Sequence, residues 1–180
     1  MRIGRARGGP AWPALCLLLC GLAGAAESPY ARAREGDWIE WKVVQEDRGQ
    51  KHEYTHRDTL VERKDESVVV ESTTDVSGQP VSRRSSFNLK ESSASPRNSK
   101  AIQQEKQAEG EEILELEGKS YKCRWVQWKI TVTLGEQKLE TVQKVWTCPD
   151  VPMGGKVKSV VQNPGGTQTF VLAGFGKAKP

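Results

Sequence analysis

Two histidines make up the sequence feature closest to a catalytic motif. The segment His52-Glu53-Tyr54-Thr55-His56 formally matches H-E-x-x-H, in which a helix places both histidines on one face to bind zinc. Here Gly49 precedes the segment, and no apolar helical stripe surrounds it. In a β-strand the two histidines would lie about 13 Å apart, because each residue advances the chain by roughly 3.3 Å. A zinc hydrolase is therefore a remote alternative, and we predict no metal site.

Other catalytic signatures are missing from the sequence. It contains no G-x-S-x-G turn, no P-loop and no dinucleotide-binding fingerprint. Adjacent carboxylates such as Glu111 and Glu112 would point to opposite faces of a strand, which is unsuitable for a paired acid and base. We therefore predict a non-enzymatic protein without catalytic residues or a cofactor.

Two cysteines outside the N-terminal segment have an informative spacing. Gly135 and Glu136 are typical of a two-residue hairpin turn with glycine first. In that register, opposed residues have numbers that sum to 271, so Cys123 faces Cys148 and Trp125 faces Trp146. Opposed Cβ atoms lie about 4.5–5.5 Å apart, close to disulfide distance. We predict a cross-strand disulfide, with two buried thiols as the alternative.

The N-terminus has the pattern of a secretory signal peptide, residues 1–25. Arg2, Arg5 and Arg7 precede an apolar segment that ends in Ala23-Gly24-Ala25, an A-x-A cleavage site. The apolar run is too short for a membrane-spanning helix, so we predict no transmembrane anchor. Lipid attachment through Cys20 is a minority alternative, because the bulky Leu19 precedes it. The mature protein is predicted to be secreted or periplasmic after cleavage near Ala25.

Composition argues against a nucleic-acid partner. The 180 residues carry a formal net charge of +4, but without residues 1–25 the chain has 24 basic and 23 acidic residues. No basic stripe remains after this removal, so a nucleic-acid interface is not expected. The length suits a single domain after processing.

Alternating segments between turn residues predict an all-β domain, with at most one short helix. After a lead-in at residues 26–35, residues 36–176 read as about nine strands separated by short turns, which is typical of an antiparallel meander. A sheet of this size must twist and curl, which predicts a half-barrel or an open barrel. Residues 81–89 form a polar strand expected near an edge. Residues 91–110 are expected to be a polar loop or short surface helix, since 99–109 contain good helix formers.

Two segments carry a resemblance to known proteins. Gly118-Lys119-Ser120-Tyr121-Lys122-Cys123 and Trp146-Thr147-Cys148-Pro149-Asp150-Val151-Pro152-Met153-Gly154-Gly155 resemble a motif of uncharacterised secreted bacterial proteins. The strand layout is similar to the LolA/LppX-like superfamily, whose curved sheet cups a hydrophobic cavity that can hold lipid. The resemblance implies a carrier or binding role, but it transfers no functional residue. The prolines and glycines at 151–155 predict a rigid corner.

Two function classes follow from this pattern. In the first, an exported, non-catalytic envelope protein binds a lipid or another hydrophobic ligand, and its concave face is lined by Trp38, Trp41, Trp128, Ile130 and Phe170. In the second, the domain is structural or binds an envelope protein partner through an open sheet edge or one face, with no small ligand. Aromatic residues also fill sheet interiors, so core packing is the competing explanation for the tryptophans.

Overall fold

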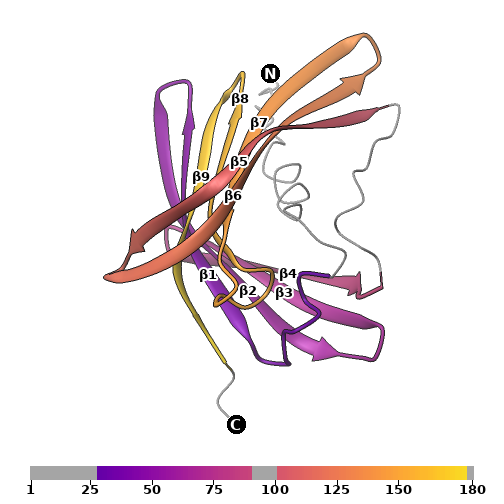
Figure 1. Ribbon diagram of the computed structural model, residues 1–180, viewed down its shortest axis with the longest axis vertical. Helices are drawn as coiled ribbons and strands as arrows, with labels where there is room; N and C mark the ends of the chain where they lie inside the picture. Colours follow the sequence, from indigo (N-terminus) through magenta and orange to yellow (C-terminus); the bar gives the residue numbers. More distant parts are fainter. Residues whose placement is uncertain (1–27, 91–100, 178–180) are drawn as a thin grey trace, which may run out of the picture.

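The described residues form one open sheet of nine antiparallel strands. The computed structural model describes residues 28–90 and 101–177, and it contains no helix within these ranges (Figure 1). The predicted all-β class is thereby confirmed, and the sheet does not close into a barrel. The described part of the chain has no helix that is long and apolar enough to cross a membrane. The predicted signal peptide, with Cys20 and the cleavage site near Ala25, lies outside the described residues.

The strand order joins two meanders through the first and last strands. The strands are β1 (Trp38–Asp47), β2 (Gln50–Arg63), β3 (Ser67–Val76), β4 (Gln79–Asn88), β5 (Ile102–Leu116), β6 (Lys119–Leu134), β7 (Gln137–Thr147), β8 (Lys156–Asn163) and β9 (Gly166–Gly176). Their order across the sheet is β4-β3-β2-β1-β9-β8-β7-β6-β5. Strands β4 and β5 are consecutive in the sequence but form the opposite edges. Figure 1 shows a strong twist, with β3 and β4 turned well away from the direction of β6 and β7.

Tight turns with positive φ angles connect the hairpins. Arg48-Gly49, Ser77-Gly78 and Glu117-Gly118 each combine a non-glycine residue at φ near 50° with a glycine at 73–81°. Positive φ at both central residues is the requirement of a type I′ turn, whose twist matches that of the flanking strands. These turns fix the register of the hairpins that they close.

Each face of the sheet is defined by alternation along β1. Ile39, Trp41 and Val43 are buried and point to one side, which we call face A. Trp38 and Lys42 point to the other side, face B. Directly opposed residues of paired strands lie on the same face of the sheet. The register therefore shows which residues of each neighbouring strand lie on face A and which lie on face B.

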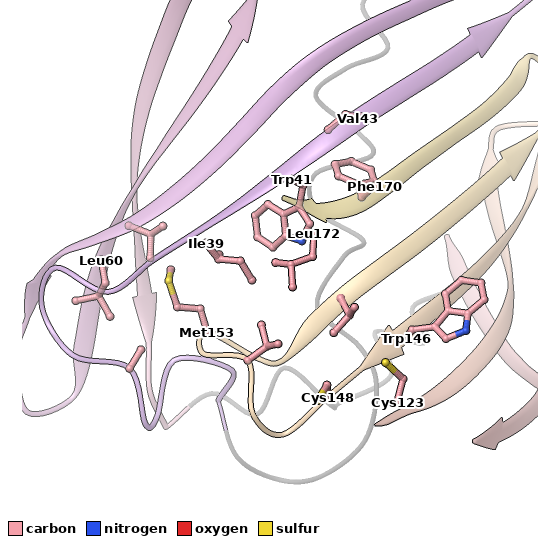
Figure 2. Packing of buried hydrophobic residues seen from close by; sticks show 14 of the residues in the cluster. Ile39, Trp41, Val43, Leu60, Cys123, Trp146, Cys148, Met153, Phe170 and Leu172 are labelled. Carbon is pink, nitrogen blue, oxygen red and sulfur yellow. The ribbon is translucent and has the colours of Figure 1, made fainter. Parts of the chain in front are cut away.

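The hydrophobic core lies where the sheet meets two irregular segments. Ala33 of the lead-in and Val151 and Met153 of the 148–155 corner pack with Ile39 and Leu60 (Figure 2). The guanidinium group of Arg63 fixes the lead-in by donating hydrogen bonds to its backbone carbonyls, those of Tyr30, Ala31 and Ala33. The predicted corner between β7 and β8 is confirmed, and its apolar residues belong to the core.

The prediction of a loop or short helix at residues 91–110 is wrong from residue 102 onward, where the chain forms a strand. Strand β5 begins at Ile102 and pairs with β6 from Ile102–Val132 to Leu116–Lys119. Helix propensities differ by less than about 1 kcal/mol per residue, so a long ladder of backbone hydrogen bonds overrides them. The polar composition of the segment is explained by its edge position, where both faces are largely exposed. Residues 91–100 lie outside the described residues.

Gly155 is predicted to be essential to the corner. It has φ +73°, and an added Cβ would lie 2.5 Å from the carbonyl oxygen of Cys148. Gly135 has φ +62° with no atom within 4 Å of that position, so it is the matched control. Gly135→Ala should cost about 1 kcal/mol of unfolding free energy from backbone strain alone. Gly155→Ala should cost about 1–3 kcal/mol more because of the clash. Equal losses in urea denaturation would contradict this account.

Candidate functional site

Four of the five residues predicted to contact a ligand lie on one face. Trp41 and Phe170 are buried on face A of β1 and β9, and Trp128 and Ile130 lie on the same face of β6. Trp38 lies on face B, where the Arg57 guanidinium stacks 3.9 Å from the centre of its ring. The structure therefore brings four of the predicted residues onto a common surface but not Trp38.

The register arranges face A in rows that cross the central strands. One row, called row 1, consists of Val126, Val145, Ser159, Phe170 and Val43, on β6, β7, β8, β9 and β1 in turn. The adjacent row 2 consists of Trp128, Gln143, Val161, Gln168 and Gln45 on the same strands. On β7, β8 and β9 these rows contain no charged side chain. Rows 1 and 2 are thus apolar, with neutral polar groups at fixed positions, and the Lys156 ammonium lies 5.0 Å from the centre of the Phe170 ring.

Two buried polar atoms in these rows have no hydrogen-bond partner among the described residues. They are the hydroxyl oxygen of Ser159 and the indole nitrogen of Trp128. Ser159 is completely buried, and its neighbours in row 1 are Val145 and Phe170. Leaving a buried donor unpaired costs about 1–3 kcal/mol, and native proteins contain few such groups. A third such atom, Asp47 Oδ1, lies at the end of β1. The two donors in rows 1 and 2 are the candidate contacts for a ligand on face A.

Buried glutamines flank the unpaired donors. Gln143 and Gln168 are both buried, and the Gln168 side-chain nitrogen donates a 2.6 Å hydrogen bond to the Tyr54 hydroxyl. Sequence alternation alone treats Ser159, Gln143 and Gln168 as ordinary polar strand residues. Their position on face A becomes evident only from the strand pairing, which places each of them next to an apolar residue of a neighbouring strand. A local stretch of sequence does not contain the strand pairing.

Four apolar residues of β6, β7 and β8 are also buried on face A. They are Val126, Ile130, Val145 and Val161. Among the described residues, the core cluster around Trp41, Ile39 and Met153 does not extend to them. The apolar character of face A thus continues beyond the packed end of the sheet toward the rows that contain the unpaired donors.

The H-E-x-x-H segment lies on strand β2, as predicted. His52 and Glu53 are exposed, and Glu53 forms an ion pair with Lys51. His56 is buried, so the two histidines differ in environment as well as in position. Within the described residues, no group of three His, Cys, Asp or Glu side chains is placed to hold a metal ion.

His56 is part of a buried hydrogen-bonded network. Its Nε2 lies 3.1 Å from Asp58 Oδ1 and its Nδ1 lies 3.0 Å from Thr74 Oγ1, while Ser72 donates to Asp58 at 2.6 Å. An ionised carboxylate only accepts, so Nε2 donates to Asp58 and, in the neutral ring, the Thr74 hydroxyl donates to Nδ1. The His56 ring also stacks on Trp41, with ring centres 5.9 Å apart.

This network has the connectivity of a hydroxyl–imidazole–carboxylate triad but not its setting. A nucleophilic triad needs converging N–H donors that stabilise an oxyanion beside the hydroxyl. Thr74 lies inside β3, which is paired on both sides, so the local backbone donors serve the sheet ladders. We interpret the network as a structural connection between β2 and β3.

The two cysteines are free, buried thiols, so the predicted disulfide is wrong. The register itself is confirmed, from Leu134–Gln137 through Trp125–Trp146 to Arg124–Thr147. Strand β7 ends there, and the Cys148 N–H donates to the Gly155 carbonyl at 2.8 Å, so the corner rather than the ladder orients Cys148. Each thiol is directed to a different acceptor, the Tyr121 carbonyl for Cys123 and the Asp150 carboxylate for Cys148. Figure 2 shows the two side chains beside Trp146 at one side of the core.

Comparison with known proteins shows the fold alone. No protein-family model and no curated protein matches the chain. A presumed exported protein with a YmcC-like fold from Bacteroides fragilis is 11% identical, with a TM-score of 0.52 over 86% of this chain and 100% of that one. A presumed lipoprotein from Parabacteroides distasonis is 10% identical, with a TM-score of 0.48 over 85% and 100% of the two chains. The first of these shows a shared fold, and the second is too distant to carry an argument. The narrower motif group stays a prediction from the residues.

Asp58 is predicted to stabilise the fold only above acid pH. Burial alone would raise the pKa of its carboxyl, but the His56 hydrogen bond and charge, the Ser72 hydroxyl and Lys156 together lower it. A lowered pKa means that the stabilisation is present above the unfolded value of about 3.9 and is lost as pH falls through the folded value. Asp58→Asn should cost about 1–3 kcal/mol at neutral pH.

The same substitution should flatten the loss of stability below about pH 4, because the group that titrates there is removed. Asp65→Asn, in an exposed turn, is the control and should leave both quantities unchanged. A variant at position 58 with the wild-type acid denaturation profile would refute the role assigned to this carboxylate.

Both thiols should resist alkylation in the folded protein. Burial, with smaller effects of Cys148 and Glu112, raises the pKa of Cys123 to about 11, so little reactive thiolate is present at neutral pH. We expect iodoacetamide to modify Cys123 and Cys148 only after denaturant is added, as measured by intact mass. Rapid modification of the native protein, or a mass lower by two hydrogens, would contradict the free, buried thiols.

Proposed function

We propose that this protein is an exported, non-catalytic domain that binds a lipid or another hydrophobic ligand against face A. The single observation that carries the proposal is the pair of unpaired buried donors, Ser159 Oγ and Trp128 Nε1, set among apolar residues of rows 1 and 2. A bound molecule that accepts a hydrogen bond from either donor would remove the energetic cost of leaving that donor unpaired. Small-ligand sites have this character, in which a few polar groups orient a ligand held by apolar contacts.

The chemistry of the rows favours a ligand with an uncharged polar group. On β7, β8 and β9 the polar side chains of rows 1 and 2 are a serine hydroxyl and two glutamine amides, and Trp128 supplies an indole N–H. These four groups carry no charge, and burying an unpaired carboxylate or phosphate beside them is costly. The Lys156 ammonium lies against the Trp41 and Phe170 rings, 4.2 and 5.0 Å from their centres. An apolar chain with an ester, amide or hydroxyl group therefore fits this face best.

Two independent features support export. Residues 1–25 have the charge, apolar segment and cleavage pattern of a secretory signal. The fold is shared with a presumed exported protein from Bacteroides fragilis, although at 11% identity. The second function class, an interaction domain, is supported by a different part of the molecule, namely its two open edges.

The direct test is native mass spectrometry of the mature protein after export by a bacterial host, without detergent. We expect a lipid-sized adduct that denaturation releases. Incubation of delipidated protein with 1-oleoylglycerol should restore an adduct more efficiently than incubation with oleate at pH 8, because oleate is then charged.

The same measurement on three variants tests whether the ligand binds at rows 1 and 2 of face A. Ser159→Val and Trp128→Phe keep most of the apolar surface but remove the donors, so each should reduce 1-oleoylglycerol binding by about tenfold or more if one hydrogen bond is lost. Ser86→Val on β4, where the side chain is exposed, is the matched control. Absence of any adduct, together with no binding of added 1-oleoylglycerol, would refute the proposal. Equal binding by all three variants would place the ligand elsewhere.

A further inference from the structure

The two edges of the sheet are open and carry exposed apolar residues. No described strand pairs with the outer side of β4 or of β5. The large hydrophobic side chains exposed on the surface include Val76, Val81 and Phe87 on the β3–β4 hairpin and Ile113 on β5. Val81 is 70% exposed and Ile113 is 62% exposed, so neither contributes to the core. Open edges with apolar side chains can serve as templates for pairing with another strand.

The two edges have opposite charge. Strand β4 contains Arg83 and Arg84 and no acidic residue. Strand β5 contains five glutamates and a single lysine. Several of these charges already have partners, such as Arg84 with Glu71 and Glu109 with Arg124. Arg83 and Glu111 form no ion pair among the described residues, so each edge offers at least one charge for an external partner.

Backbone groups on both edges point outward. The turns at 77–78 and 117–118 make Val76–Gln79 and Leu116–Lys119 the hydrogen-bonded closing pairs. Alternate residues from these pairs onward direct their N–H and C=O groups away from the sheet. On β4 these include Ser82, Arg84 and Ser86, and on β5 they include Glu111, Ile113 and Glu115. Pro80 also occupies an outward position and lacks an N–H, so the available edge of β4 begins after it.

Charge discriminates among the three ways in which two copies could pair through these edges. Pairing of β5 with β5 would bring two rows of glutamates together, and pairing of β4 with β4 would bring arginines together. Only pairing of β4 with β5 joins opposite charges. We propose that β4 of one copy of this protein pairs with β5 of a second copy, so that the protein assembles edge to edge.

The direction of the strands sets the geometry of this contact. Strands β4 and β5 are separated by eight antiparallel pairings, so they run in the same direction within one sheet. A second copy added with the same face up therefore pairs its β4 in parallel with β5, and face A continues from one copy to the next. The contact joins two different surfaces, so the assembly grows into a ring or an open filament.

Sedimentation velocity of the mature full-length protein tests the proposal. Self-association should be present at about 20 mM salt and weaken strongly at about 500 mM, where charges are screened within a few ångströms. Two variants reverse one edge each: R83E/R84E makes β4 acidic, and E105K/E111K/E115K makes β5 basic, with four lysines against two glutamates. Each alone should lower the association constant by about tenfold or more.

Mixing the two variants gives the decisive result. The acidic β4 of one variant then meets the basic β5 of the other, and the unmodified edges also remain complementary, so assembly should return in the mixture. Combining all five substitutions in one chain should restore it as well. The control R48E/K138E changes net charge by the same amount as R83E/R84E, but at exposed positions away from the outward sides of both edges, and should assemble like the wild type.

A backbone substitution covers the case in which a charge variant fails to fold. Ser86→Pro removes an outward N–H of β4 without removing a hydrogen bond to β3, so it should abolish assembly while the circular dichroism spectrum stays that of the wild type. A wild-type protein that is monomeric at every concentration and salt would overturn the proposal. Assembly that persists in both single-edge variants would also overturn it. Neither outcome bears on ligand binding by face A.

Discussion

The pairing of β1 with β9 is the constraint on which the rest of this structure depends. It joins the β1–β4 and β5–β9 meanders into one sheet, with a register that runs from Trp38–Gly176 to Asp47–Gly166. Because of this register, Phe170 and Val43 continue the row that begins at Val126, and face A becomes one surface across five strands. The same pairing places β4 and β5 at opposite edges. Both the apolar face and the two open edges are thus consequences of one central contact.

Local sequence patterns predict the features of the fold that depend on residues close together in the sequence. Glycine at 135 and the alternation from Val126 to Leu134 were sufficient for the register of β6 with β7, and β-branched residues were sufficient for β3. The loop or helix predicted for residues 102–110 is wrong because helix propensity is a local property, whereas the pairing of this segment with β6 is not. The predicted disulfide is wrong because the β6–β7 ladder ends at Arg124–Thr147, one residue before the two cysteines, and Cys148 instead bonds to Gly155. The unpaired state of Ser159 depends on residues of β7 and β9, which no single segment specifies.

Two kinds of unsatisfied polar group connect the fold to function. Inside the sheet, the neutral donors at Ser159 and Trp128 have no partner within residues 28–90 and 101–177, and we propose that they contact a small uncharged ligand. At the edges, backbone groups and charges face water, which suits another strand of opposite charge. The His56–Asp58 network shows the contrasting case, in which buried polar groups satisfy one another and serve stability. The proposed functions thus depend on the polar groups that have no partner among the described residues, and the stability of the β2–β3 pair depends on those that do.

The central claim is that Trp128 donates its indole N–H to a ligand on face A. It is tested most directly by nuclear magnetic resonance of the delipidated protein labelled with nitrogen-15 at tryptophan, with resonances assigned through Trp128→Phe and Trp38→Phe. On addition of 1-oleoylglycerol, the account predicts a downfield shift of the Trp128 indole proton, as expected for a new hydrogen bond. The Trp38 indole on face B should not move. An unchanged Trp128 resonance at saturating 1-oleoylglycerol would contradict the account.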